Sequence, residues 1–325
     1  MAKSNINKQK SGSPSWGGTW TMQKLDAFVA YVKAYLTIMK NFRYWKTIYF
    51  DGFAGSGERL KEKNKQQTGF DFFLAENSLE DIDLYKGSVK RILDLKELTF
   101  DYYYFIDTKS RNIEKINSLK DTITHIDPER IIVRKGDCNQ QIPKLAEALR
   151  TRKYVALIFI DPFGMQIEWE SINSLKETRC DIWILIPSGV AVNRLLPKTG
   201  KVRNKEKLEK FFGLAYDDLH NFFYADKTTT TLFGKDIKIE KLANPIDKVA
   251  ELYKNQLETI WKYVTQEPLI LKNSKNVPIF HLHFASNNNV ALKIASQIIE
   301  KKTEINGKNK HRMDRSDLES DNRVR

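Results

Sequence analysis

The hydrophobic positions of the chain follow two spacings, and their alternation predicts the architecture. From Trp20 to Phe42, apolar residues recur every three or four positions, which is typical of an amphipathic helix, with Thr21 as its candidate N-cap. The run WKTIYFDGF that follows is short, apolar and rich in aromatic residues, as expected for a buried strand. The chain therefore begins its ordered part with a helix and a strand.

The same alternation continues through the middle of the chain. Further apolar runs predict strands that end at Asp107, at Asp137, at Asp161 and near Ser188. Strands that alternate with helices at this period form a parallel sheet that is covered on both faces. The predicted helices are residues 88–95, residues 112–123, the segment QIPKLAEALRT, residues 169–176 and residues 246–264.

The alternation of predicted strands and helices is interrupted once, and it resumes before the end of the chain. Residues 193–245 interrupt it, and we interpret them as an insertion of helices and loops. The later strands PLILKN and VPIFHLHFAS are separated by a short turn, so they must form an antiparallel hairpin, and a last helix is predicted over residues 289–301. We expect residues 1–15 to be a flexible N-terminal arm, residues 16–300 a single domain and residues 301–325 a disordered tail.

Composition narrows the class of protein. The 325 residues are 41% hydrophobic and 29% charged, which suits a soluble globular domain. A net charge of +13 fits either a polyanionic partner such as nucleic acid or a solvated, lysine-rich surface. Cys138 and Cys180 alone cannot build a disulfide framework or a zinc site, so a reducing compartment is expected. The sequence has neither an apolar leader nor a stretch long enough to span a membrane, so we predict a cytoplasmic protein with no membrane association.

A glycine-rich turn follows the first predicted strand, in the stretch YFDGFAGSG. In an open α/β sheet such a turn lets the backbone approach a nucleotide-like ligand. Gly55 and Gly57, with Ala54 between strand and glycines, fit that need. Asp51 at the strand end is placed to accept a hydrogen bond from an amine of the ligand, and Phe53 to form one wall of the site. An ordinary tight turn is the alternative.

The next three strands also end in acids. Asp107 follows the second strand, where a carboxylate typically accepts hydrogen bonds from both ribose hydroxyls. Asp137, with Cys138 beside it in KGDCN, is positioned for the adenine amine, and Asp161 ends the fourth strand. Any one of these acids is consistent with a plain turn. Together, on consecutive strands, they favour a shared binding site at the carboxyl ends.

The segment DPFG, residues 161–164, has the most specific chemistry. It resembles the Asp-Pro-Pro-Tyr or Phe motif of amino-methyltransferases, in which the acid and the next carbonyl accept hydrogen bonds from an exocyclic amine and the ring stacks on the base. The resemblance makes Asp161, Pro162 and Phe163 candidate catalytic residues and Gly164 a candidate substrate contact. Phe-Gly replaces Pro-aromatic, as it does in a motif like that of the tRNA guanine N2-dimethyltransferases, so the target amine stays open. A strand-ending Asp-Pro turn is the alternative.

The order of the motifs resembles one family over residues 16–299. GGTWTMQKL with Tyr31, YFDGFAGSG, GDCN, FIDPFG with Trp169, Asp181 with Arg194, and FHLHFASNNN are together similar to the three-Cys-motif partner protein family. That family is bacterial and is similar to the Rossmann-like class I methyltransferases. The resemblance implies S-adenosylmethionine as cofactor, a mostly parallel seven-stranded sheet with a C-terminal antiparallel hairpin and a helical insertion, and a partner protein that carries three cysteines.

Further side chains have both a functional and a structural interpretation. The family pattern suggests that Lys24 and Tyr31 line the cofactor mouth, although aromatic residues at helical spacing usually belong to a core. Arg194 and the basic run over residues 198–207 would hold phosphates or form a solvated loop. His281 and His283 share one face of a strand, but no third ligand lies near them in sequence, so we do not expect a metal site.

These observations predict an S-adenosylmethionine-dependent methyltransferase that acts on an exocyclic amine of a nucleic-acid base, adenine N6 or guanine N2, in DNA or RNA. The first alternative is a non-catalytic or degenerate cofactor-binding partner subunit in a mobile-element or phage-defence operon. The second is a nuclease on the same sheet, for which the sequence offers no extra acidic cluster. Asp161 and Phe163 distinguish the first two, because only the methyltransferase needs them.

Overall fold

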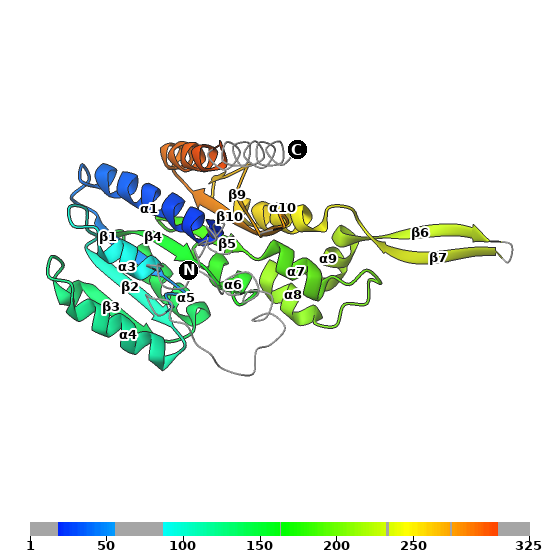
Figure 1. Cartoon of the computed structure of the whole chain (residues 1–325), viewed down its shortest axis with the longest axis horizontal. Helices are drawn as coiled ribbons and strands as arrows, with labels where there is room; N and C mark the ends of the chain where they lie inside the picture. The colour runs from blue at the N-terminus through cyan, green and yellow to red at the C-terminus, as the bar shows by residue number, and fades with distance from the viewer. Residues whose placement is uncertain (1–18, 56–86, 163, 232–233, 274, 305–325) are drawn as a thin grey trace, which may run out of the picture.

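The computed structural model describes residues 19–55, 87–162, 164–231, 234–273 and 275–304. Its centre is one large sheet flanked by helices, with a narrow two-stranded projection on one side (Figure 1). The strands of the sheet are β1 (Lys46–Asp51), β2 (Tyr102–Asp107), β3 (Ile131–Lys135), β4 (Tyr154–Ile160), β5 (Cys180–Ile186), β8 (Tyr263–Val264), β9 (Leu269–Lys272) and β10 (Pro278–Ser286).

The strand order of the sheet is β3–β2–β1–β4–β5–β10–β8, and β9 also pairs with β10. β1 to β5 are parallel to one another, whereas β10 runs antiparallel to β5, β8 and β9. The predicted mixed α/β fold with a mostly parallel sheet is thus confirmed. Eight strands form this sheet in the described part of the chain, not seven. The additional strand, β8, lies within residues 246–264, where the sequence predicted helix throughout.

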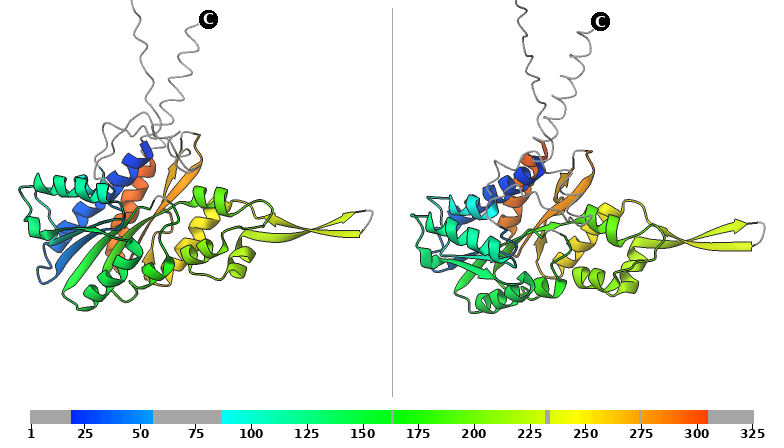
Figure 2. Two further views of the ribbon diagram at one scale, coloured as in Figure 1. Left: turned by 90° about the horizontal axis from the view of Figure 1, so that it is seen from below. Right: turned by 60° about the horizontal axis from the view of Figure 1, so that its bottom comes forward.

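Helices cover both faces of the sheet (Figure 2). One face packs against α1 (Thr19–Met39), α3 (Ser88–Leu93), α4 (Ser110–Asp121) and a helix over residues 289–304. The other face packs against α5 (Cys138–Arg150), α6 (Trp169–Asn173), α7 (Ser188–Leu195), α8 (Lys205–Phe212), α9 (Tyr216–Phe223) and α10 (Pro245–Glu258).

The strands supply both halves of the core because successive side chains point to opposite faces. In β1, Ile48 and Phe50 face α5, whereas Tyr49 faces α1. Phe28 of α1 stacks on Phe159 of β4 with ring centroids 4.2 Å apart, which fixes the helix on the sheet. Thr21 is not the N-cap that the sequence predicted, because α1 already begins at Thr19 and Thr21 is buried within its first turn.

The insertion contains a β-hairpin as well as helices. After α8 and α9 the chain forms β6 (Tyr224–Thr231) and β7 (Gly234–Lys241), which pair only with each other and project from the body (Figure 1). We call β6 and β7 the arm. The expectation of helices and loops over residues 193–245 was therefore wrong for the arm. In β7, isoleucines alternate with lysines and an acid, and β6 ends in four consecutive threonines, so the strand pattern is too polar to stand out.

Candidate functional site

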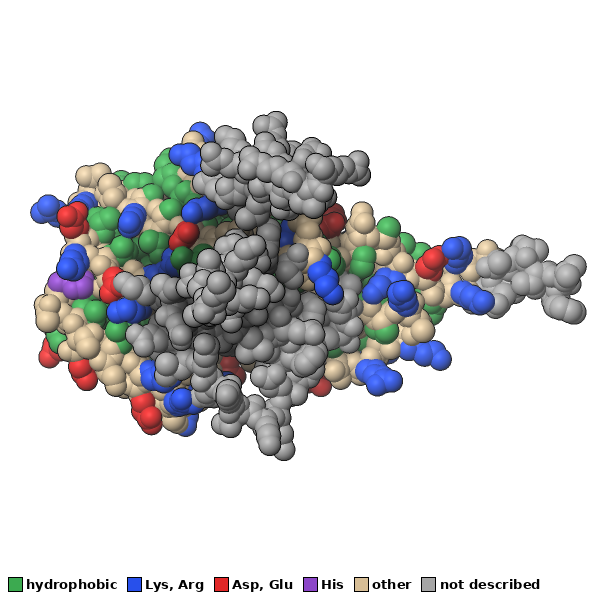
Figure 3. All heavy atoms as spheres, in the orientation of Figure 1, with side chains coloured by type: hydrophobic (Ala, Val, Ile, Leu, Met, Phe, Trp, Pro, Cys, Tyr) green, Lys and Arg blue, Asp and Glu red, His purple; other side chains and the backbone are tan. Residues whose placement is uncertain are grey.

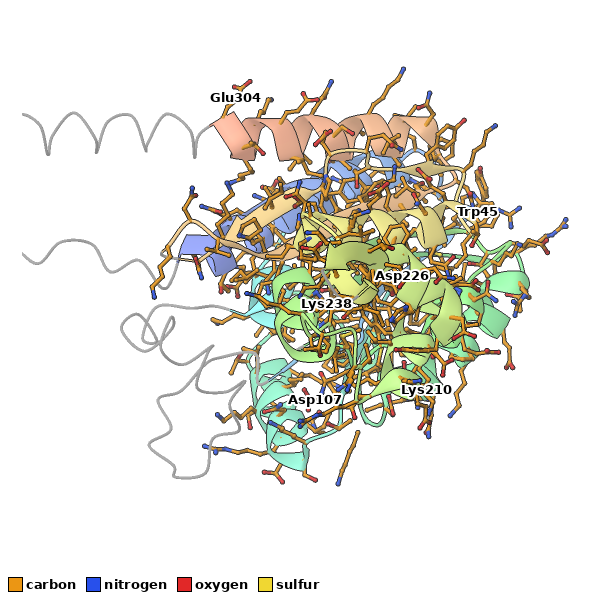
Figure 4. All side chains as sticks on the ribbon, turned by 90° about the vertical axis from the view of Figure 1, so that its right-hand side faces the viewer. Trp45, Asp107, Lys210, Asp226, Lys238 and Glu304 are labelled. Atoms are coloured by element: carbon orange, nitrogen blue, oxygen red, sulfur yellow. The ribbon has the colours of Figure 1, made fainter. Side chains whose placement is uncertain are left out.

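The parallel register brings carboxylates from β1, β2 and β4 to one edge of the sheet. Asp51 is level with Phe105 in β2 and with Phe159 in β4, so Asp107 and Asp161 each follow two residues further along. We call Asp51, Asp107 and Asp161 the carboxylate edge. Viewed along the arm, Asp107 lies on one side of the molecule and Trp45, which precedes β1, on the other (Figure 4). The acids therefore gather at the carboxyl ends, as the sequence predicted.

The turn after β1 is attached to both neighbouring strands. The Gly52 N–H donates to the Phe159 carbonyl at 3.1 Å, and the Ala54 N–H donates to the Ile106 carbonyl at 3.0 Å. The Gly55 N–H donates to Oδ2 of Asp107 at 3.0 Å. Gly55 has a φ of +65°, which favours glycine, and among the described residues no atom lies within 4 Å of the position a Cβ would take. The turn is thus held in place by both neighbouring strands.

Gly52 is required for a different reason. A Cβ at this position would lie 2.4 Å from Sγ of Cys138 and 2.9 Å from Cδ1 of Ile160, so only glycine fits. Cys138 is buried beneath the turn, and burial raises the pKa of its thiol. Cys138 therefore supports the turn from below. Sequence reasoning overlooked Gly52, although its position directly after Asp51 was the available signal.

Asp51 is fully buried, and the protein's own donors occupy both of its oxygens. Ser88 Oγ and the Tyr49 hydroxyl donate to Oδ2 at 2.7 and 3.2 Å, and the Phe53 N–H donates to Oδ1 at 3.2 Å. Burial raises the pKa of Asp51 to about 7, and the charge of Asp161 adds to this increase. In this conformation Asp51 organises the turn. Ser88 was missed because it is 37 residues away in sequence.

Asp161 forms an ion pair with Lys24. Nζ of Lys24 lies 2.5 Å from Oδ2 of Asp161, and the two side chains are 3% and 24% exposed. Lys24 reaches the carboxylate edge because the beginning of α1 lies over the carboxyl ends of the strands. A nearly buried ammonium group therefore compensates the charge of Asp161, whose own side chain stays partly exposed.

Asp107 and Asp137 are more accessible. Oδ1 of Asp107 accepts from the Lys109 N–H at 2.8 Å, and the side chain is partly exposed. Asp137 is exposed and caps α5, where its Oδ1 accepts from the Asn139 N–H at 2.9 Å. Asp107, Asp137 and Asp161 are thus at least partly exposed, whereas a ligand could reach Asp51 only by displacing the protein donors that surround its buried carboxylate.

Tyr31 is not brought to the carboxylate edge. Its hydroxyl donates to Oδ2 of Asp181 at 2.7 Å, and Ser286 Oγ donates to Oδ1 of the same carboxylate at 2.5 Å. Asp181 is level with Leu157, four residues before Asp161 along β4, which corresponds to about 13 Å. Tyr31 is 2% exposed and packs against Trp183 and Phe284. The expectation that Tyr31 lines the site was therefore wrong, and its core interpretation applies.

The remaining candidates are only partly described. Gly57 and Phe163 lie outside the described residues, whereas Pro162 is buried and Gly164 half-buried. Arg194 lies in α7, but its side chain lies outside the described part. Among the described residues, no group of three or more His, Cys, Asp or Glu is arranged to hold a metal ion, and no helix has the length and apolar character needed to cross a membrane.

His281 and His283 belong to the core of the sheet. Nδ1 of His281 lies 2.7 Å from Oγ of Ser188, and burial lowers the pKa of His281 to about 4. Burial likewise lowers the pKa of His283 to about 3. Both imidazoles are therefore neutral at pH 7.

No protein-family model matches the chain, and neither does any curated protein. Among solved structures, a Legionella pneumophila protein described under the family model DUF519 is 14% identical, with a TM-score of 0.38. That match covers 75% of this chain and 93% of the other. A conserved hypothetical protein of Streptococcus pyogenes is 13% identical, with a TM-score of 0.26, and covers 63% of this chain and 94% of the other. Likeness at this level supports no argument about function.

Proposed function

We propose that the protein is an S-adenosylmethionine-dependent methyltransferase that acts on an exocyclic amine of a nucleic-acid base, adenine N6 or guanine N2. The observation that carries this proposal is the carboxylate edge, where the partly exposed Asp107 and Asp161 flank a glycine turn and no described atom lies within 4 Å of the Cβ position of Gly55. Ligands of open α/β sheets bind at this edge. The same arrangement without Asp161 would suit any nucleotide-like ligand.

The sheet supports the same proposal. Five parallel strands continued by an antiparallel β10 and its neighbours β8 and β9 are compatible with the class I methyltransferases. The motif order adds the resemblance to the three-Cys-motif partner protein family, with its implied partner. We expect the protein to act in the cytoplasm.

The accessible acids have distinct roles in this proposal. Asp107 would accept hydrogen bonds from ribose hydroxyls, because each of its oxygens has a spare lone pair beside the backbone N–H it already accepts. Asp137 would accept from the adenine amine. Asp51 would act indirectly, since Ser88 and Tyr49 occupy its Oδ2 and the carboxylate keeps the turn in place.

Asp161 would orient the substrate amine. S-adenosylmethionine would supply a methyl group from its sulfonium sulfur: an N–C bond would form as the C–S bond breaks, S-adenosylhomocysteine would leave, and the methylated amine would lose one proton to solvent. Positioning therefore accounts for most of the rate enhancement. Lys24 contacts Oδ2 of Asp161, and we assign Oδ1 to the incoming N–H. Phe163 would stack on the base, as the motif suggests.

The same ion pair favours a second candidate, a non-catalytic cofactor-binding subunit. Lys24 already satisfies part of the acceptor capacity of Asp161 at 2.5 Å. A protein that only binds the cofactor for a partner would not need to free Asp161 from Lys24, because it would have no substrate amine to orient. The two candidates differ in whether Asp161 affects methyl transfer.

The test follows labelled methyl groups from S-adenosylmethionine into mixed DNA and RNA, with and without the three-cysteine partner, and then into adenine, guanine and cytosine after digestion. Asp161→Asn keeps an oxygen for Lys24 but removes the charge. We expect it to lower transfer at least about 100-fold, roughly 3 kcal/mol, and to leave cofactor affinity nearly unchanged. The control is Asp121→Asn, an exposed acid at the end of α4.

Equal transfer by the wild type and Asp161→Asn would reject the role of Asp161. Tight cofactor binding without transfer under any condition would favour the second candidate. Label in cytosine, or at a ring atom of adenine or guanine, would contradict the proposed target amines.

A further inference from the structure

The arm is a two-stranded ribbon, and neither strand pairs with another strand in the described part of the chain. β6 and β7 are each eight residues long, so the ribbon extends about 27 Å. The views from three directions show it projecting away from the sheet (Figures 1 and 2). An isolated hairpin is only marginally stable in water, so a projecting one needs a firm attachment or a partner.

The root of the arm is firmly attached to the preceding loop. The Tyr224 hydroxyl donates to the Pro197 carbonyl at 2.9 Å, and Nζ of Lys241 donates to the Leu196 carbonyl at 2.5 Å. Gly200, with a φ of +72°, leaves room for Ile239, whose Cγ2 would lie 2.6 Å from a Cβ at that position. The loop over residues 198–207 and the root of the arm are therefore in direct contact and form one surface unit.

Positive charge accumulates on this unit. Lys227 and Lys238 are register partners, so their side chains leave the same face of the ribbon, and both are exposed. Lys227 pairs with Glu240 at 2.8 Å, and the two strands of the arm together carry four lysines and three acids, so most of the excess positive charge of this unit lies in the loop. Residues 198–207 add five basic residues and one acid. Figure 3 shows blue side chains around the root of the arm on the visible face.

The root also places two cations close together. Partial burial lowers the pKa of Lys241, and the neighbouring charge of Lys198 lowers it further. A polyanion would relieve this repulsion. The described side chains of the ribbon are mostly polar or charged, and lysine is depleted at protein interfaces, so these features disfavour a protein partner.

We propose that the arm and the basic loop over residues 198–207 form a docking surface for duplex DNA, with the ribbon lying in the major groove. The major groove of B-form DNA is about 12 Å wide and admits a two-stranded ribbon, whereas the major groove of A-form RNA is deep and narrow. Lys227, Lys238 and the basic loop contact phosphates. This inference rests on the proposed function, because it takes the protein to act on a nucleic acid and names duplex DNA as the substrate that is brought to the carboxylate edge.

The first experiment measures the salt dependence of binding to a labelled DNA duplex by anisotropy. Lys227→Ala/Lys238→Ala removes two exposed charges from the arm, and Lys40→Ala/Lys96→Ala removes two exposed charges outside it as the matched control. Each lost phosphate contact lowers the slope of log K against log salt by about 0.9, so we expect the arm variant to lower it by about 2. Affinity at low salt should fall about tenfold, and the control should change much less.

The second experiment shortens the arm. An Asn-Gly turn replaces residues 226–239 and joins Ala225 to its register partner Glu240, so that Tyr224 and Lys241 keep their anchors. We expect this protein to lose most of its DNA affinity and to retain S-adenosylmethionine binding. Its affinity for duplex RNA should change less than its affinity for duplex DNA.

Three outcomes would overturn the docking surface: an unchanged salt slope in the shortened protein, an equal loss for duplex RNA, or a change of oligomeric state on shortening without a change in DNA binding. The last would assign the arm to contacts between copies of the chain. Arm-dependent DNA binding in a protein that transfers no methyl group would contradict the proposed function alone.

Discussion

Polar groups at the carboxylate edge are held by several elements at once, whereas the arm is attached to the body only at its root in the described part of the chain. Asp51 accepts from β1, from the turn after it and from α3, and Asp161 is paired with α1. Lys227 of the arm has its described ion pair with the adjacent strand only. A substitution at the edge should therefore affect folding and chemistry together, whereas a substitution in the arm should affect binding alone.

The largest effect on stability is expected when Lys24 is removed. Lys24→Met leaves the carboxylate of Asp161 without its cation, and breaking a buried ion pair costs 3–5 kcal/mol. Because Asp161 is 24% exposed, we expect the lower end, about 3 kcal/mol, in urea unfolding. Lys24→Met/Asp161→Asn should recover much of the loss. If the double variant is no more stable than the single one, the pair does not support the edge.

Overpacking the turn should cost somewhat less. Gly52→Ala places a methyl group 2.4 Å from Sγ of Cys138, and we expect a loss of about 2 kcal/mol in the free energy of unfolding. Adding Cys138→Ala should restore part of it. Gly164→Ala is the matched control, because among the described residues no atom lies within 4 Å of its Cβ position. Equal losses for Gly52→Ala and Gly164→Ala would refute the close packing of the turn.

The buried Asp51 should make stability depend on pH. Its pKa rises from 3.8 to about 7 on folding, so between these values the folded protein holds a proton that the unfolded chain has lost. Stability therefore falls as pH increases through this window, and it falls less in Asp51→Asn, by at least about 1 kcal/mol. Ser88→Ala removes a hydrogen bond that lowers this pKa, so it should extend the window upward. Parallel pH profiles for wild type and Asp51→Asn would contradict the burial of Asp51 as an acid.

The smallest effect on stability is expected in the arm. The shortened protein retains Tyr224 and Lys241 at the root, and the removed residues contribute no buried side chain in the described part of β6 and β7. Its free energy of unfolding should change by less than about 0.5 kcal/mol. A large loss would show that the arm belongs to the folded core and would remove the contrast with the carboxylate edge.

The carboxylate edge was predictable because local and long-range signals coincide there. The apolar runs before Asp51, Asp107 and Asp161 mark strand ends, and parallel strands bring their carboxyl ends to one edge. The partners were not predictable in this way. Ser88 donates to Asp51 from 37 residues away in sequence. The packing of α1 on the sheet decides that Lys24 contacts Asp161 at the strand ends, whereas Tyr31 contacts Asp181 instead.

The arm and β8 escaped prediction for a related reason. The hydrophobic pattern reports burial, and the arm is a strand pair with little to bury. β8 has two residues, Tyr263 and Val264, and it follows α10 after a connection of four residues, so its apolar pattern reads as a continuation of the helix. Elements held by pairing with a single neighbour therefore leave a weaker trace in the sequence than elements that form the core.

Calorimetric titration of S-adenosylmethionine tests the central claim, that the carboxylate edge is a cofactor site, most directly. The account predicts binding in the micromolar range and at least a tenfold loss, about 1.4 kcal/mol, in Asp107→Ala, because the carboxylate hydrogen bonds to ribose are charge-assisted. Asp121→Ala serves as the control, and the unfolding midpoints are measured alongside. No binding to the wild type, or unchanged affinity in a folded Asp107→Ala, would contradict the account.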